Sequence, residues 1–285
     1  FKGAKMRFSI VIVLGVLILS NLMGRGTSHV HRSYDFDEDS RLETLVLNTN
    51  EFSAGWIEMQ SSGIYETLWS FNLQEGGLFA DGELIDINND SIKDIVLIPD
   101  LFSSFGEQNL IYIFLGNNIG FTSQPITIKD LILDYTTIRP SNLALISGST
   151  PQLAVSIGSP VRKGLLFDIK INDNNRASIE NKRVLSSPII SNGYGAVYIG
   201  SFMVDTKDYI AILSPENYQL KTSIFDISEE YKLIDSQSFN LKNSKNLLGA
   251  DIQSYKSKKS DTSGLLIPFE SDEVFLLSVK NNKAH

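Results

Sequence analysis

Short runs of apolar residues recur along the chain at intervals of about 55 residues, each bounded by polar and turn-forming positions. A marker residue opens each run, and the five markers are Glu43, Asp94, Gln152, Asp208 and Ser263. The runs are brief and rich in Val, Ile and Leu, which is typical of buried strands rather than of helices. Because no segment after residue 28 keeps a helical spacing of apolar positions, the pattern predicts an all-β chain built from repeated units.

Each unit shows the same order of predicted strands around its apolar run. One strand precedes the run, at 82–86, 143–146 and 196–204. A third strand follows it, at 109–115, 164–171, 219–227 and 272–279, and a fourth closes some units, at 122–128 and 231–239. Units of four strands, with runs that are apolar on both faces, predict a β-propeller in which neighbouring blades cover both faces of each sheet.

The pattern therefore predicts about five recognisable blades in an all-β β-propeller of four-stranded blades. The fifth unit ends after its third strand, near residue 279. Two alternatives follow: the ring is incomplete and continues in a longer chain, or the amino-terminal segment completes the last blade.

The amino terminus has the pattern of a targeting segment. Lys2, Lys5 and Arg7 precede an apolar stretch at 8–19, and small residues follow up to 28. This order favours a secretory signal peptide in residues 1–28, with a short upstream extension before Met6 and a cleavage site near 24–28. The uncharged span 8–24 is at the short limit of the roughly 17–25 residues that cross a bilayer, so a signal anchor is the alternative. A buried strand is a third interpretation. The propeller domain is assigned to 29–285, at a secreted or extracytoplasmic surface.

Composition narrows the classes of function. The formal net charge is −8 and no basic run offsets it, which argues against a nucleic-acid partner. The absence of cysteine excludes disulfides, thiolate metal sites and a cysteine nucleophile. The three histidines, His29, His31 and His285, all lie near an end, so a histidine-based catalytic centre is not expected. No catalytic constellation is visible, although carboxylates far apart in sequence would escape notice.

Two acidic loops match each other position by position. Residues 35–43 (DFDEDSRLE) and 86–94 (DINNDSIKD) both carry oxygen-bearing side chains at positions 1, 3, 5 and 9 and serine at position 6. Each precedes one of the apolar runs. Alternation places positions 1, 3 and 5 on one side of a tight turn, so their oxygens converge, as the oxygen shell of Ca²⁺ requires.

We therefore predict two calcium sites. The ligands of the first are the side chains of Asp35, Asp37, Asp39 and Glu43 and the carbonyl of Arg41. Those of the second are the side chains of Asp86, Asn88, Asp90 and Asp94 and the carbonyl of Ile92. An EF-hand is excluded because position 12 of the second loop is Leu97 and strands flank the loop. The alternative is an Asx-rich turn without metal, because Asp and Asn favour turns in any case.

The other three units lack this pattern. The third has SGSTPQ at 147–152, the fourth is shortened to DTKD at 205–208, and the fifth has KSKK at 256–259. Lysines at a ligand position would repel a cation, so we expect two metal sites rather than five. Both sites are expected to be structural, since no open position beside them suggests metal-assisted hydrolysis.

The second unit resembles the FG-GAP or VCBS repeat of propellers similar to that of the integrin α-subunit. Residues 86–97 (DINNDSIKDIVL) match the pattern D-x-[DN]-x-D-[GN]-x-x-D followed by an apolar strand. Residues 112–121 (YIFLGNNIGF) resemble the third strand and hairpin of the same repeat. The likeness is strong over 80–128, good over 33–50 and inferred from spacing beyond 140. The family favours glycine at loop position 6, so Ser40 and Ser91 imply a cost for a left-handed backbone.

This resemblance implies a rigid platform for recognition or adhesion, with a protein or a glycan as the ligand at the surface. The alternatives are a propeller-fold polysaccharide lyase or hydrolase and a purely structural domain of a larger assembly. Trp56, Tyr65 and Trp69 could stack on sugars, although aromatic residues in strands more often pack between blades. A membrane is expected as a partner only through an amino-terminal anchor.

Overall fold

The structure is a computed structural model of the 285-residue chain. It describes residues 28–48, 53–73, 78–100, 111–128, 140–146, 152–158, 161–172, 174–193, 195–241, 252–257, 263–269, 274–280 and 283–284. All regular elements in these residues are β-strands. The predicted targeting segment at 1–28 lies outside the described part except for Ser28. None of the described residues forms a helix long and apolar enough to cross a membrane.

Four antiparallel sheets have four strands each. The first comprises β1 (Ser28–Tyr34), β2 (Glu43–Asn48), β3 (Ser53–Met59) and β4 (Tyr65–Asn72). The second comprises β5 (Leu78–Ile85), β6 (Asp94–Asp100), β7 (Ile111–Phe114) and β10 (Ile126–Ile128). The third comprises β11 (Pro140–Ile146), β12 (Gln152–Ile157), β13 (Lys163–Ile171) and β14 (Ala177–Leu185). The fourth comprises β15 (Tyr198–Val204), β16 (Lys207–Glu216), β17 (Gln219–Asp226) and β18 (Lys232–Asn240).

The fifth sheet has three strands, β19 (Gln253–Lys256), β20 (Ser263–Pro268) and β21 (Val274–Leu277). This agrees with the expectation that the fifth unit ends after its third strand. Two small hairpins complete the described elements: β8 (Gly116–Asn117) with β9 (Gly120–Phe121), and β22 (Val279–Lys280) with β23 (Lys283–Ala284). The second hairpin lies against the fourth sheet, where the backbone N–H of Ala284 donates to Asp235 Oδ2 at 2.7 Å.

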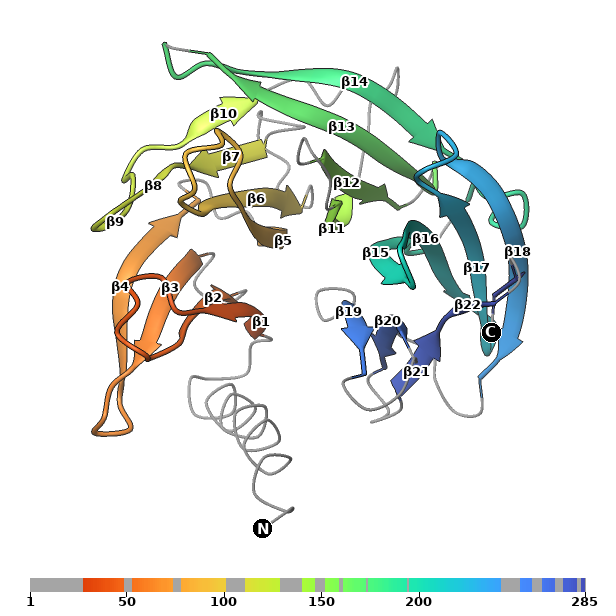
Figure 1. Ribbon diagram of the computed structural model, residues 1–285, viewed down its shortest axis with the longest axis horizontal. Helices are drawn as coiled ribbons and strands as arrows, with labels where there is room; N and C mark the ends of the chain where they lie inside the picture. Colours follow the sequence, from red (N-terminus) through yellow and green to blue (C-terminus); the bar gives the residue numbers. More distant parts are fainter. Residues whose placement is uncertain are drawn as a thin grey trace.

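The five sheets are arranged as the blades of a β-propeller, which confirms the predicted fold class. Figure 1 shows β1, β5, β11, β15 and β19 toward the middle of the molecule and β4, β10, β14 and β18 on the outside. Along the inner strands, β1 contacts β5, β5 contacts β11, β11 contacts β15, and β15 contacts β19. The five marker residues all lie on the second strand of their sheets, so the repeat read from the sequence is the blade.

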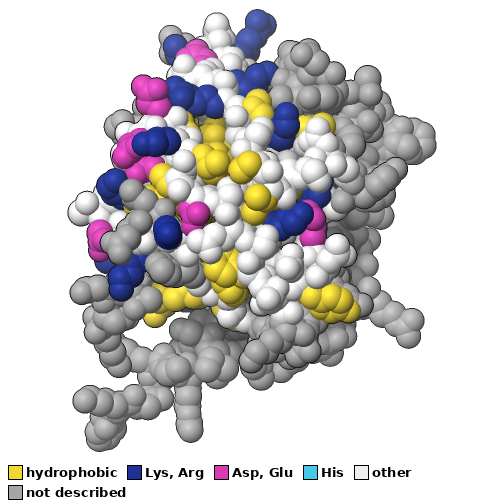
Figure 2. All heavy atoms as spheres, turned by 90° about the vertical axis from the view of Figure 1, so that its right-hand side faces the viewer, with side chains coloured by type: hydrophobic (Ala, Val, Ile, Leu, Met, Phe, Trp, Pro, Cys, Tyr) yellow, Lys and Arg dark blue, Asp and Glu magenta, His cyan; other side chains and the backbone are white. Residues whose placement is uncertain are grey.

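The apolar runs are buried on both faces because each sheet packs against its neighbours. In β6, Ile95, Val96, Leu97 and Ile98 are all fully buried. Ile95 and Leu97 join the core between the first and second sheets, and Val96 and Ile98 join the core between the second and third. Two further cores lie between the third and fourth sheets and between the fourth and fifth. Outer strands such as β14 are largely exposed. On the face that includes β18, Figure 2 shows side chains of both charge signs interspersed among apolar ones.

Polar side chains also join the blades along their inner strands. Asp81 on β5 accepts the backbone N–H of Leu143 on β11 at 2.7 Å. Asn142 on β11 both donates to the carbonyl of Ile199 and accepts its N–H, at 2.7 and 2.8 Å. β1 pairs with β2 in its own blade, and no strand of the first sheet pairs with the fifth within the described ranges. The two ring-closure alternatives stay predictions.

Candidate metal centre

Both acidic loops occupy the same place in their blades. Loop 1 (35–43) joins β1 to β2, and loop 2 (86–94) joins β5 to β6. In each, the last loop residue is also the first residue of the second strand, so position 9 is fixed by the sheet. The first eight positions lie between the two strands. The blade thus presents each loop at the same edge of its sheet.

The backbones of the two loops have the same conformation at their turning points. Positions 4 and 6 have positive φ in both: 60° and 71° at Glu38 and Ser40, and 60° and 73° at Asn89 and Ser91. Ser40 and Ser91 therefore adopt the left-handed backbone conformation that was expected at loop position 6. Glu38 and Asn89 are exposed.

The two loops also share four hydrogen bonds between side chain and backbone. The N–H of position 6 donates to the carboxylate of position 1, at 3.1 Å in loop 1 and 2.9 Å in loop 2. The N–H of position 5 donates to position 3, and that of position 7 donates to position 5. The N–H of position 2 donates to position 9, at 2.6 and 2.8 Å. Two segments far apart in the chain therefore fold their acidic side chains inward by the same backbone contacts.

Loop 1 gathers its carboxylates most tightly. One oxygen from each of Asp35, Asp37, Asp39 and Glu43 lies within 4.8 Å of the others, and this is the only such group of acidic or histidine side chains among the described residues. Asp35 Oδ1 and Glu43 Oε1 are buried and have no hydrogen-bond partner. Buried carboxylate oxygens without partners are costly, and a bound cation would satisfy them. The donor set, oxygen only and strongly anionic, fits Ca²⁺.

Glu43 and Asp94, at position 9, differ in how they are satisfied. Both are buried, with exposed fractions of 1% and 0%. Glu43 accepts one N–H, from Phe36, and burial together with the nearby Asp37 and Asp35 raises its pKa. Asp94 uses both oxygens, accepting from Ile87 N–H and from Gly116 N–H, each at 2.8 Å. Burial is the main cause that raises the pKa of Asp94 to about 6.

Gly116 has a steric reason to be glycine. A Cβ atom there would lie 2.1 Å from the carbonyl oxygen of Lys93, so no larger residue fits without a backbone shift. This close approach brings the Gly116 N–H to Asp94 Oδ1. The β8–β9 hairpin, which follows the third strand of the second blade, therefore supports loop 2 through Gly116. Loop 2 has no fourth carboxylate. In its place, Asn88 donates its amide to Asp90 Oδ2 at 2.8 Å.

Sequence reasoning missed the side chains that surround loop 1. The loop pattern assigns Arg41 only a backbone carbonyl as a calcium ligand. In the structure its guanidinium binds Asp39 and also lies 2.6 Å from Glu58 Oε1. The hydrogen bond to Arg41 lowers the pKa of Asp39. Glu58 is buried and pairs across the sheet with Glu43. The alternation of Ala54, Trp56 and Glu58 on one face of β3 was the signal that could have located it.

The fourth blade, whose corresponding turn is fully described, closes the same hairpin without an acidic cluster. In the fourth blade, Asp205 and Thr206 form the turn, and Lys207 Nζ lies 3.2 Å from Asp226 Oδ2. Residues 147–151 of the third blade and 258–262 of the fifth lie outside the described residues. The expected loss of metal loops there stays a prediction, as does coordination by the carbonyls of Arg41 and Ile92.

The aromatic side chains considered for sugar stacking mostly pack between blades. Trp56 is 2% exposed, and its ring lies 5.5 Å from that of Phe121 in the second blade. The ring of Trp69 lies 4.7 Å from that of Phe114 and its Nε1 donates to the carbonyl of Thr122 at 3.1 Å. Tyr65 is half-buried at the start of β4.

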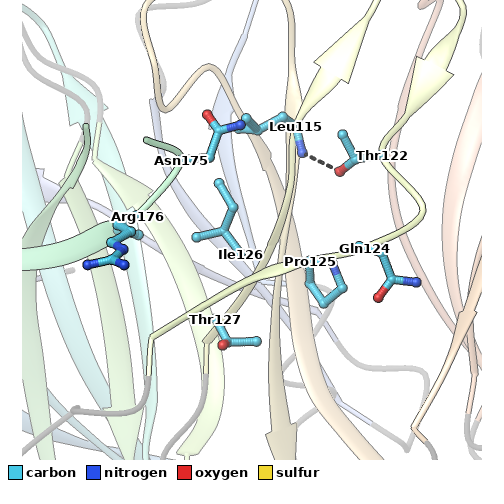
Figure 3. Close-up of a pocket in the computed structure, with 9 residues that line it drawn as sticks. Leu115, Thr122, Gln124, Pro125, Ile126, Thr127, Asn175 and Arg176 are labelled. Carbon is cyan, nitrogen blue, oxygen red and sulfur yellow. Dashed lines mark hydrogen bonds between the residues drawn. The ribbon is translucent and has the colours of Figure 1, made fainter. Parts of the chain in front are cut away.

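A separate groove lies on the outer side of the second and third blades. Its volume is about 560 Å³, and its lining includes Leu115, Gln124, Ile126, Asn175 and Arg176. Figure 3 shows Ile126 between Asn175 and Arg176 on one side and Pro125 on the other. The groove contains none of the predicted metal ligands.

Comparison with known proteins does not assign the chain to a family. No family model and no curated protein matches the sequence. A crystal structure of a protein from Lactobacillus plantarum is similar over 75% of this chain, with 15% sequence identity and a TM-score of 0.47. The chain spans 56% of that protein's length. The FG-GAP or VCBS resemblance therefore stays a prediction.

Proposed function

We propose that this chain is a calcium-binding β-propeller in which loops 1 and 2 each hold one Ca²⁺ ion. The observation that carries the proposal is the shared geometry of the two loops: equal left-handed positions and equal hydrogen bonds, with two buried carboxylate oxygens of loop 1 lacking any partner. Turn chemistry alone accounts for the inward hydrogen bonds. It does not account for four carboxylates held within 4.8 Å of one another.

Each proposed site has five protein ligands. The side chains at positions 1, 3, 5 and 9 and the carbonyl at position 7 would supply five of the roughly six to eight oxygens that Ca²⁺ takes, and water would supply the rest. Position 9 belongs to the second strand, so the ion would tie the turn to the blade. Exposed sites of this kind suit extracellular calcium, for which modules bind at about 10⁻⁴–10⁻³ M. This agrees with the secreted or extracytoplasmic location proposed from the amino terminus.

We further propose that the propeller serves as a recognition module for a surface partner. The edge of the first blade that carries loop 1 exposes Leu42, Met59 and Ile64, with exposed fractions of 49%, 48% and 69%. These exposed side chains are aliphatic or thioether groups, which do not stack on sugars as aromatic rings do. The aromatic Trp56 is buried between blades. Apolar surface of this type favours a protein partner over a glycan. Asp81, an inner-strand carboxylate of the kind that the lyase or hydrolase alternative would need, accepts the N–H of Leu143 and so joins two blades.

The test is thermal unfolding in excess chelator and in 10 mM Ca²⁺. If the sites bind at about 10⁻⁴ M, each is expected to contribute about 2.7 kcal/mol at 100-fold excess, and the midpoint should rise by at least about 5 °C. The double variant Asp35→Ala, Asp86→Ala should lose this shift. Asp205→Ala, in the metal-free turn of the fourth blade, is the matched control and should keep it. A midpoint that is the same in chelator and calcium would refute both sites.

A further inference from the structure

The guanidinium of Arg41 lies at the opening of loop 1. Arg41 occupies position 7, and its Nε donates to Asp39 Oδ2 at 2.6 Å, with Nη2 binding the same oxygen. The side chain is 40% exposed. A permanent positive charge therefore already contacts one of the four carboxylates that the metal would use.

The two oxygens of Asp39 have different roles. Oδ1 accepts the N–H of Arg41 at 2.8 Å, and in loop 2 the equivalent Asp90 Oδ1 accepts the N–H of Ile92 at 2.8 Å. The backbone thus occupies the same oxygen in both loops and leaves Oδ2 for a cation. In loop 2 this oxygen accepts a neutral amide, from Asn88. In loop 1 the guanidinium takes it.

The guanidinium also contacts acceptors at the end of β3 and in the turn that follows it. Arg41 Nε is 2.6 Å from Glu58 Oε1, and Nη1 donates to Gln60 Oε1 at 2.7 Å. Gln60 in turn donates to Glu58 at 3.1 Å and to Glu66 at 2.8 Å. Glu58, Gln60 and Glu66 lie at the end of β3, in the turn and at the start of β4. The guanidinium therefore connects loop 1 to the β3–β4 turn.

We propose that Arg41 is an intramolecular cation that competes with Ca²⁺ for Asp39 Oδ2, and that metal binding displaces the guanidinium from Asp39 and leaves it held by its existing contacts with Glu58 and Gln60. This rests on the proposed calcium function and adds a regulatory role to it. Loop 2 has Ile92 at the same position and so has no competing charge there. Calcium binding at loop 1 would then change the contacts of residues 60–66, a segment that includes the exposed Ile64 and follows the exposed Met59.

Exchanging position 7 between the loops tests the competition. Arg41→Ile is placed in a chain whose loop 2 carries Asp86→Asn, and Ile92→Arg in a chain whose loop 1 carries Asp35→Asn. Calcium titration by calorimetry then reads one loop at a time. We expect Arg41→Ile to lower the dissociation constant of loop 1 about two- to five-fold, the scale of an exposed ion pair, and Ile92→Arg to raise that of loop 2. Circular dichroism confirms folding, and Arg41→Gln replaces Arg41→Ile if the latter misfolds.

Hydrogen exchange at 60–66 gives a second readout. Calcium should change protection there in the chain with arginine at position 41 and leave it unchanged in Arg41→Ile. An unchanged or weaker affinity in Arg41→Ile would overturn the competition and leave Arg41 as a support for Asp39. Calcium binding at loop 1 that is detected only in Arg41→Ile would support the competition strongly. If neither chain binds calcium at loop 1, the proposed function fails at this loop and the competition fails with it.

Discussion

The second and fourth blades join their first two strands in opposite ways. In the second blade, loop 2 carries Asp86, Asp90 and Asp94, and the carboxylate of Asp94 accepts two backbone N–H groups. In the fourth, a turn of Asp205 and Thr206 suffices, and Lys207 binds Asp226 of the third strand. The comparison teaches that the two blades satisfy buried carboxylates at this edge in different ways. An ion pair with Lys207 serves Asp226 in the fourth blade. Backbone N–H groups serve Asp94 in the second blade, where, in our proposal, Ca²⁺ also binds.

The largest expected effect comes from removing the buried carboxylate of the second blade. Asp94→Ala leaves the N–H groups of Ile87 and Gly116 buried without an acceptor. We expect it to lower the free energy of unfolding by about 3 kcal/mol, the scale for losing charged hydrogen bonds in the interior. Denaturant unfolding in chelator measures this without any contribution from metal.

Asp208→Ala is the matched control, because Asp208 lies near the start of the corresponding strand of the fourth blade, as its second residue. Its backbone carbonyl accepts the N–H of Ile227 at 3.0 Å, and its side chain is half-exposed. The substitution should therefore cost less than about 0.5 kcal/mol, as for surface positions in general. Equal losses for the two variants would contradict the difference between these blades.

A smaller effect, with a pH signature, is expected at Asp226. Burial favours a higher pKa at Asp226, but hydrogen bonds from Ser228 and Lys207 outweigh it, and the pKa lies below its ordinary value. A carboxyl whose folded pKa is depressed stabilises the fold above its unfolded pKa of about 3.9 and loses that contribution as pH falls through the folded value. Asp226→Asn should therefore lower the free energy of unfolding by about 1 kcal/mol at pH 7.

The difference between Asp226→Asn and the unsubstituted chain should narrow as the pH falls below about 4. Denaturant unfolding at pH 7 and pH 3.5 gives the comparison. Added calcium should leave the difference unchanged, because the ion pair of the fourth blade needs no metal. A difference in unfolding free energy that depends on calcium would show that the fourth blade is coupled to the proposed metal sites. A difference that widens in acid would contradict the lowered pKa of Asp226.

Much of this architecture could be predicted from the sequence because it depends on local and periodic features. The second strands are short apolar runs between turn residues, so their spacing revealed the blades. The loop conformation is likewise local, since Asp, Asn and Ser at fixed positions specify the inward hydrogen bonds. The left-handed conformation of Ser40 and Ser91 follows only from the resemblance to the FG-GAP or VCBS repeat, which favours glycine at that loop position.

The contacts between distant segments could not be predicted. The pairing of Glu43 with Glu58 depends on the register of β2 and β3, and one residue of slip would turn Glu58 away. The hydrogen bond from Gly116 to Asp94 requires the β8–β9 hairpin to approach loop 2, which spacing alone does not show. Arg41 reaches Glu58 only because both lie at the same edge of the first sheet. These are the contacts that distinguish one acidic loop from the other.

The smallest expected effect concerns the left-handed serine of loop 2. Ser91 has a φ of 73°, and Asp205 in the fourth blade has a φ of 55°. A left-handed residue other than glycine costs about 1–2 kcal/mol, and Asp tolerates this region better than Ser. Replacement by glycine removes this backbone cost, but glycine also loses more conformational entropy on folding, which offsets part of the gain in stability. Ser91→Gly should therefore raise the free energy of unfolding by about 0.5 kcal/mol, and Asp205→Gly by less. Melting in chelator measures both, and a less stable Ser91→Gly would mean that the serine side chain itself supports the loop.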